Sequence, residues 1–164
     1  MADQPPSFHI EPVWSPERLL LRVSGVIDEN ADLSPLSRAQ ASKICLHLGE
    51  VHRINSFGVR AWVEAIRTIP LSSRLVLSHC SPPVIDQCNM VAGFNGHGVI
   101  ESFYAPMLCE QCEEYTQVLY DTRICLANGH ALPATRCPRC QGSMDIDDLE
   151  EQYLTFLRDP QILP

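Results

Sequence analysis

The sequence predicts an α/β fold: a mixed β-sheet with helices, followed by a small cysteine-bearing β module and a C-terminal helix. Three observations lead to this fold class. Strand patterns alternate with helix patterns through the first 105 residues, which is typical of layered α/β domains. The apolar run Lys43–Leu48 is typical of a strand in the middle of such a sheet. Beyond Pro106 the composition changes to cysteines, acidic residues and turn-forming residues, which indicates a separate module.

The first half of the expected domain begins with two strands, Phe8–Trp14 and Arg18–Val26, because a Ser-Pro-Glu turn separates them. A short helix is expected over Ala31–Ser42, with Pro35 in its first turn, where a missing backbone N–H costs nothing. The buried strand Lys43–Leu48 follows this helix.

The second half of the domain begins with a helix at Asn55 and Ser56, since both side chains can cap a helix. Apolar residues then recur every three or four positions as far as Ile69, and Pro70 ends the pattern. The remaining elements are a strand, a helix opened by a serine and a proline, and a final strand: Arg74–Ser78, the helix after Ser81–Pro82, and Val99–Ala105.

We expect three parts in the chain, namely residues 1–105, 106–146 and 147–164. The middle part holds two strand-like segments, Tyr115–Tyr120 and Thr122–Leu126. The last part holds an amphipathic helix at about Asp148–Arg158, which we expect to return and cover a face of the first domain. Its apolar side chains share one helix face: Leu149, Tyr153, Phe156 and Leu157.

Four cysteines in the middle part have the spacing of a metal site. Cys109 and Cys112 form one pair with two residues between them, Cys137 and Cys140 form another, and 24 residues separate the pairs. Two such turns can direct four sulfurs to one point, which predicts one structural zinc ion. The arrangement resembles a zinc ribbon. The second turn, Cys-Pro-Arg-Cys-Gln-Gly, has the glycine typical of that family, whereas the first lacks it.

Other interpretations of these cysteines are weaker. Iron in the same site would make a rubredoxin-like electron carrier. Unligated thiols or a redox pair are also possible, but a thioredoxin-like pair needs a strand–helix junction, which neither pair shows. His130 would act as a ligand only if one of the four cysteines did not bind the metal. The other four cysteines lie in apolar surroundings and are expected to be small core residues: Cys45, Cys80, Cys88 and Cys125.

Composition argues against several classes of function. The formal net charge is −8, and residues 106–164 alone carry −6. Acidic protein repels a phosphate backbone, and a zinc ion with four thiolates adds a further net −2, so nucleic acid is disfavoured as a partner. No apolar run approaches the ~20 residues of a membrane span, and Met1–Ser7 lacks the basic region of a secretory signal. We therefore expect a cytoplasmic protein, without a membrane partner.

The segment Leu46–Val59 contains a buried strand followed by Asn55-Ser56-Phe57-Gly58 at a helix start. This pattern resembles the STAS family, whose simplest members are bacterial anti-sigma factor antagonists with an Asp-Ser-x-Gly turn. The resemblance covers about residues 7–105 in order. Three further segments match the family's second strand, first helix and Ser-Pro-x-Val helix: Leu21–Asp28, Ala31–Leu36 and Ser81–Phe94.

The resemblance implies a non-enzymatic signalling protein that binds a protein partner. In the family, the serine at the position of Ser56 is phosphorylated by a partner kinase, often the anti-sigma factor itself. Phosphate there adds ~1.5–2 negative charges at a helix N-terminus, which the helix tolerates while a docked partner need not. Asn55 departs from the family's aspartate and lacks its charge. The alternative is that Asn55 and Ser56 only cap the helix.

No catalytic motif is apparent elsewhere in the sequence. The histidines are dispersed, and Asn95–Gly98 has neither the lysine nor the following helix of a phosphate-binding loop. Trp14 and Trp62 are expected to be packing residues. The sequence therefore predicts a protein that is not an enzyme, and it leaves the partner's identity and the oligomeric state open.

Overall fold

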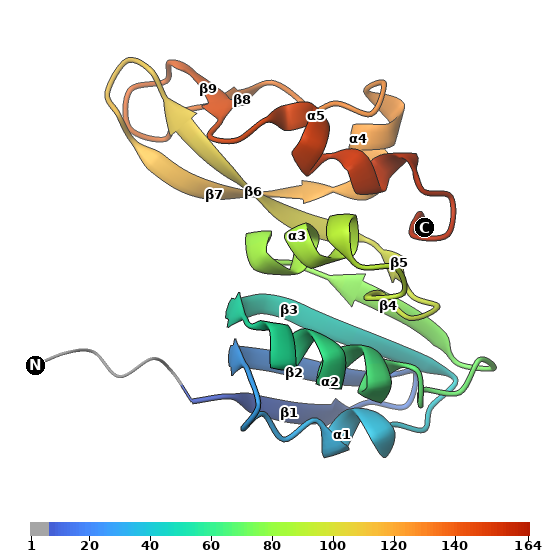
Figure 1. The fold of residues 1–164 in the computed structure, drawn as a ribbon. Helices are drawn as coiled ribbons and strands as arrows, with labels where there is room; N and C mark the ends of the chain where they lie inside the picture. The colour runs from blue at the N-terminus through green and yellow to red at the C-terminus, as the bar shows by residue number, and fades with distance from the viewer. Residues whose placement is uncertain (1–6) are drawn as a thin grey trace, which may run out of the picture.

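The computed structural model describes residues 7–164, and the fold is of the expected α/β class, with two β-sheets and five α-helices in that range (Figure 1). Six of the seven residues of the polar segment Met1–Ser7 lie outside the described residues. Within residues 7–164, no helix combines the length and the apolar composition that crossing a membrane requires.

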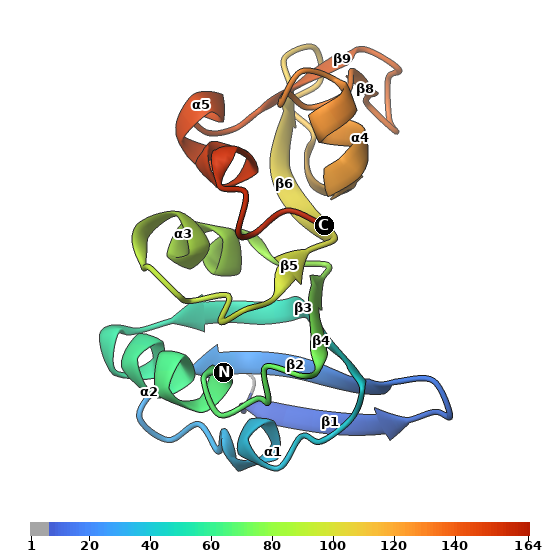
Figure 2. The same cartoon turned by 90° about the vertical axis from the view of Figure 1, so that its right-hand side faces the viewer.

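The first sheet is the mixed sheet that the sequence predicts. Its strands are β1 (His9–Trp14), β2 (Leu19–Ile27), β3 (Lys43–Ile54), β4 (Arg74–Ser78) and β5 (Val99–Ile100), in the order β1-β2-β3-β4-β5. The β1–β2 pair is antiparallel and the other pairs are parallel. Figure 2 shows the helices on one side of this sheet: α1 (Ser34–Ser37), α2 (Ser56–Ile66) and α3 (Pro82–Met90).

The second sheet is entirely antiparallel. Its strands are β6 (Ser102–Cys109), β7 (Tyr115–Asp121), β8 (Thr135–Arg136) and β9 (Ser143–Ile146), in the order β7-β6-β9-β8. The helix α4 (Thr122–Ala127) follows β7 directly. The chain ends with α5 (Glu150–Tyr153) and a 3-10 helix, Thr155–Arg158.

One hydrophobic core runs through both halves of the molecule. Below α2, Trp62 is fully buried, and its indole Nε1 donates a hydrogen bond to the carbonyl of Phe94 at 2.9 Å. The rings of Trp62 and Phe94 stack with centroids 5.6 Å apart. Trp62 is thus the packing residue that was expected, but the same prediction was wrong for Trp14, whose exposed fraction is 62%. Trp14 ends the edge strand β1, so a neighbouring strand, β2, flanks it on one side only.

The expected single strand Val99–Ala105 is in fact two strands in different sheets. Glu101 interrupts it: its N–H donates to Leu77 of the first sheet at 2.8 Å, and its carbonyl accepts from Thr122, beside the second, at 3.0 Å. The chain therefore changes sheets at Glu101. The strand β6 then runs without interruption through Pro106, where a boundary was expected, and ends at the metal-site residue Cys109.

Two other expected elements differ in the structure. The helix expected over Ala31–Ser42 is only one turn long, Ser34–Ser37. The segment Thr122–Leu126, expected to be a strand, is the helix α4. The Asp121 side chain caps α4 by accepting hydrogen bonds from the N–H groups of Arg123 and Ile124, at 2.8 and 3.4 Å. This cap outweighs the strand preference of the β-branched residues that follow.

The C-terminal segment packs against α3 and β6, as Figure 1 shows. Asn89 of α3 donates to the carbonyl of Tyr153 at 2.9 Å and accepts from the N–H of Phe156 at 2.8 Å. Phe156 also meets Phe103 edge-on, with ring centroids 5.0 Å apart. The expected helix Asp148–Arg158 is shorter than predicted, and Leu149, expected on its buried face, is 63% exposed because it precedes α5.

Candidate metal centre and helix-start surface

The four cysteines predicted to bind metal lie together at one end of the second sheet. Cys109 ends β6, Cys112 follows in the turn before β7, and Cys137 and Cys140 lie between β8 and β9. Their sulfur atoms all lie within 4.8 Å of one another. The Cys109–Cys140 sulfur distance is 3.5 Å and the Cys112–Cys137 distance is 3.6 Å. The structure thus confirms that these four residues are placed to bind a metal ion.

The two cysteine turns have the same backbone hydrogen bonds. In the first, the N–H of Glu113 donates to the carbonyl of Cys109 at 2.9 Å; in the second, Gln141 donates to Cys137 at 3.0 Å. Glu113 and Gln141 both have a positive φ, 56° and 63°, and neither is glycine. The first turn therefore closes like the second without the glycine that it lacks.

Gly142 of the second turn lies against a residue of the first. A Cβ atom at this position would lie 2.5 Å from the side-chain oxygen of Gln111, which belongs to the first cysteine turn. The two turns therefore pack directly against each other. The glycine in the family-like sequence Cys-Pro-Arg-Cys-Gln-Gly leaves space for this contact, and a larger residue would displace the flexible end of the Gln111 side chain.

Backbone donors favour negative charge on the sulfurs. The N–H groups of Arg139 and Gly142 point at the sulfurs of Cys137 and Cys140, each at 3.4 Å. A hydrogen bond from the backbone of Cys112 lowers the pKa of the Cys109 thiol to about 7, whereas burial raises the pKa of the Cys112 thiol to about 12. Thiolates are the form that binds metal, so metal binding would release the remaining thiol protons of the cluster.

The sulfur geometry fits one four-coordinate ion. A tetrahedron with metal–sulfur bonds of ~2.3 Å has edges of ~3.8 Å, close to the two sulfur distances above. A disulfide would need a sulfur–sulfur distance of ~2.05 Å, and all eight cysteines of the chain are free. Four thiolates fill the coordination sphere, so the site leaves no position for a substrate or an activated water.

The remaining cysteines lie apart from this cluster and behave as expected of core residues. Cys45, Cys80 and Cys125 are buried and Cys88 is partly buried. Burial raises the pKa of the Cys88 thiol to about 12 and that of Cys125 to about 11, which keeps both uncharged. Among the described residues, no histidine joins the cysteine cluster, so His130 is not part of it.

The second predicted site, Asn55–Gly58, forms the N-terminus of α2. The side-chain oxygen of Asn55 caps the helix by accepting a hydrogen bond from the N–H of Gly58 at 2.8 Å. A Cβ atom on Gly58 would lie only 2.0 Å from the carbonyl oxygen of Ile27, so the helix rests directly on the end of β2. Ser56 and Phe57 point outward: Ser56 is exposed and Phe57 is 69% exposed.

Glu29 belongs to this helix start, although sequence reasoning did not anticipate it. The amide nitrogen of Asn55 donates to the Glu29 carboxylate at 2.9 Å, across 26 residues of sequence. This hydrogen bond lowers the pKa of Glu29. No motif marks Glu29, and only the close approach of the β2 exit to α2 brings it here.

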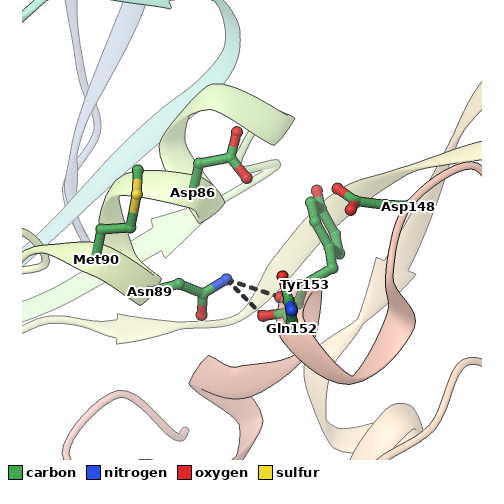
Figure 3. Close-up of a pocket in the computed structure, with 6 residues that line it drawn as sticks. All are labelled: Asp86, Asn89, Met90, Asp148, Gln152 and Tyr153. Atoms are coloured by element: carbon green, nitrogen blue, oxygen red, sulfur yellow. Dashed lines mark hydrogen bonds between the residues drawn. The ribbon is translucent and has the colours of Figure 1, made fainter.

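Figure 3 shows a pocket of about 380 Å³ between α3 and the C-terminal segment. Asp86 and Asp148 face it from opposite walls. Burial raises the pKa of Asp86, and the negative charge of Asp148 raises it further. The amide of Asn89 crosses the pocket floor to the carbonyls of Gln152 and Tyr153, at 3.3 and 2.9 Å. These hydrogen bonds join α3 to the C-terminal segment, so the pocket lies along a contact between two parts of the same chain.

No protein-family model matches this chain, and a search of curated proteins finds no significant similarity. The resemblance to the STAS family therefore rests on the sequence motifs quoted above and stays a prediction. The metal site stands independently of that resemblance, because it follows from the positions of four sulfur atoms.

Proposed function

We propose that this protein is a non-enzymatic regulatory adaptor, similar to anti-sigma factor antagonists, that binds a protein partner near Ser56. A structural zinc ion holds its second interaction surface in shape. The observation that carries this proposal is the helix start at Asn55–Gly58, where a fixed backbone presents a serine and an aromatic side chain to solvent.

Phe57 supports the proposal of a docking surface. An aromatic side chain that is 69% exposed at a helix start leaves apolar area in water, and aromatic residues are frequent anchors of protein interfaces. The backbone beneath Phe57 is held by the Asn55 cap and by the contact of Gly58 with Ile27. A rigid anchor loses little conformational entropy when a partner binds.

Ser56 gives this surface a means of regulation by a serine kinase, such as the anti-sigma-type kinase that the resemblance to the STAS family implies. It is the first residue of the 11-residue helix α2, where the helix dipole stabilises phosphate. The neighbouring Asn55 lacks the charge of the family's aspartate, but it holds the Glu29 carboxylate at 2.9 Å. Glu29 thus supplies a negative charge close to the position where the family has one.

Zinc is the metal that best suits the cysteine cluster, since a closed site of four thiolates is typical of structural zinc. Metal analysis of the purified protein tests this proposal. We expect a colourless protein with one zinc ion per chain, whereas visible absorption and bound iron would indicate the rubredoxin-like alternative. The acidity of residues 106–164 continues to disfavour nucleic acid as the partner of this module.

The adaptor proposal is tested by affinity capture from the host with five forms of the chain. We expect the wild type and Ser56→Ala to retain a common partner that Phe57→Ser and Ser56→Glu lose. Leu71→Ser is the matched control, because Leu71 is 85% exposed but lies beyond the other end of α2. Equal capture by all forms would exclude this surface, and mass spectrometry of Ser56 from host-expressed protein tests the phosphorylation directly.

A further inference from the structure

The side of the first sheet opposite its helices carries a group of basic residues. Side chains alternate along each strand, so the neighbours of the buried core residues point to this uncovered side. Lys43 and Arg74 are paired across β3 and β4, and Arg18 lies just before β2 at the same end of the sheet. Arg22, four residues after Arg18, is also exposed, and Glu11 of β1 is paired with it.

A groove of about 420 Å³ lies at the corner of this basic side. Arg18 and Lys43 supply its positive charge, Val13 and Leu20 supply apolar area, and Ser15 and Glu17 complete the lining. Val13 is 40% exposed, so part of the apolar lining is accessible to solvent. Among the described residues, neither ion pair uses a basic side chain of this face. We call these six lining residues the basic groove.

The C-terminal half carries a segment with the opposite character. Residues 145–151, the acidic strip, contain five acidic residues and no basic one. Leu149 is in the middle of the strip and is 63% exposed. The strip thus presents the exposed Leu149 among carboxylates, while the basic groove presents two apolar side chains, two cations and the single carboxylate of Glu17.

We propose that the acidic strip of one copy of this chain docks in the basic groove of a second copy. Leu149 would then cover Val13 and Leu20, while the flanking carboxylates approach Arg18 and Lys43. The strip cannot reach the groove of its own chain, because β1 and α5 lie at opposite ends of the molecule in both views (Figures 1 and 2). Each copy has one strip and one groove, so two reciprocal contacts close a symmetric dimer.

Sedimentation velocity of the full-length, metal-loaded protein tests this proposal. We expect dimers at about 50 mM NaCl that dissociate at about 500 mM, because salt screens exposed charges beyond a few ångströms. The dimer dissociation constant should rise by about tenfold or more over this range. A protein that stays monomeric at both salt concentrations would overturn the proposal.

Charge reversal identifies the surfaces. Arg18→Glu with Lys43→Glu should abolish the dimer, and so should Asp147→Lys with Glu151→Lys, two side chains that cap no helix. A mixture of these two double variants should dimerise again, since one reciprocal contact is native and the other has both charges reversed. Arg67→Glu, at the exposed residue that directly follows α2, should leave the dimer unchanged.

Circular dichroism establishes that each variant is folded, so a loss of the dimer reports on the contact and not on stability. A dimer that persists in both double variants would overturn the proposal and direct attention to another surface, such as the free edge of β7. A monomer whose groove instead binds vesicles of anionic lipid would also overturn it.

Discussion

The two sheets of this protein are stabilised in different ways. In the first, long strands place fully buried residues such as Leu46 and Leu48 against helices, and Trp62 fills the space beneath α2. In the second, β8 has two residues and β9 has four, and most side chains of β7 are at least partly exposed. The first sheet thus has an ordinary hydrophobic core, whereas the cysteine end of the second has little apolar area to bury.

This contrast shows what the metal site contributes. Small modules with few buried side chains generally need a metal or a disulfide to fold. Here the four cysteines occur at the ends of β6, β8 and β9, two of which are only two and four residues long. The two halves are nevertheless linked, because β6 leaves the first sheet at Glu101 and the C-terminal segment returns to α3.

The largest effect is expected from removing the metal ion proposed for the four-cysteine site. Structural zinc contributes about 10–16 kcal/mol to the folding of small zinc modules, so chelation or Cys137→Ser should unfold the cysteine end of the second sheet. Hydrogen exchange should show loss of protection in β8 and β9 while the amides of β3 and β4 stay protected. Cys88→Ser, outside the cluster, should retain both metal and protection.

If β3 and β4 lost protection together with β9, the two halves would form one cooperative unit. That result would contradict the division drawn above, in which the apolar core alone holds the first sheet. The metal content of each variant must be measured as well. If Cys137→Ser kept its ion, a loss of protection could not be attributed to loss of the metal.

A second large effect is expected from deleting residues 147–164. The deletion removes Tyr153, Phe156 and Leu157, all nearly fully buried, and uncovers Phe103. Loss of one large buried aromatic side chain alone costs about 3–5 kcal/mol, so the melting temperature of the first half should fall. An unchanged melting temperature would show that the C-terminal segment stabilises only its own half.

Point variants on α3 test the contact between α3 and the C-terminal segment without shortening the chain. Asn89→Ala leaves the carbonyl of Tyr153 and the N–H of Phe156 without their partner and should cost about 2 kcal/mol. Gln87→Ala, on the same helix, removes none of these bonds and should have little effect. Thermal unfolding of both variants provides the comparison.

The first sheet was largely predictable because its strands carry their signal locally. Lys43–Leu48 is an apolar run, and the structure places it in the middle of the sheet. The extension of β3 to Ile54 was missed, since Glu50 and Arg53 break the apolar pattern and the β2–β3 register shifts nearby. The change of sheet at Glu101 has no local signal at all, because it depends on hydrogen bonds to strands distant in sequence.

The metal site was predictable for a different reason. The spacing of Cys109, Cys112, Cys137 and Cys140 encodes the two turns directly, and the pairing of β9 with β6 and β8 brings the two turns together. The intervening segment was less predictable, and the helix α4 replaced an expected strand there. At the helix start, the Asn55 cap was readable from sequence, but its bond to Glu29 depends on the tertiary fold.

A third prediction tests how rigid the first half is at the proposed docking surface. Gly58→Ala places a Cβ atom about 2.0 Å from the carbonyl oxygen of Ile27, so the backbone of α2 must move. We expect a loss of about 3 kcal/mol in the free energy of unfolding, measured by denaturant titration. Gly129→Ala in the second half meets no atom within 4 Å and should cost only about 1 kcal/mol, from its φ of +74°.

The smallest expected effect is a dependence on pH near the junction of the two sheets. The ring of His47 stacks on that of His79 with centroids 4.3 Å apart. The backbone N–H of His79 donates a hydrogen bond to the Ser102 hydroxyl of β6 at 2.9 Å. Burial lowers the pKa of His47, and His79 and Arg22 lower it further, while Glu50 opposes them. The folded state therefore binds a proton on His47 less readily than the unfolded state.

The sign of the pH effect follows from this difference. As the pH falls below about 6.5, the unfolded chain takes up the proton first, so stability decreases until the pH passes below the folded-state pKa. Because His47 is only partly buried, solvent screening should keep the loss under about 1 kcal/mol. Melting temperatures between about pH 7.5 and 5.5 should fall less for His47→Gln than for wild type or the exposed control His52→Gln. Equal falls in all three proteins would mean that the stacked pair does not sense pH, and that the junction between the sheets is held by hydrogen bonds and apolar contacts alone.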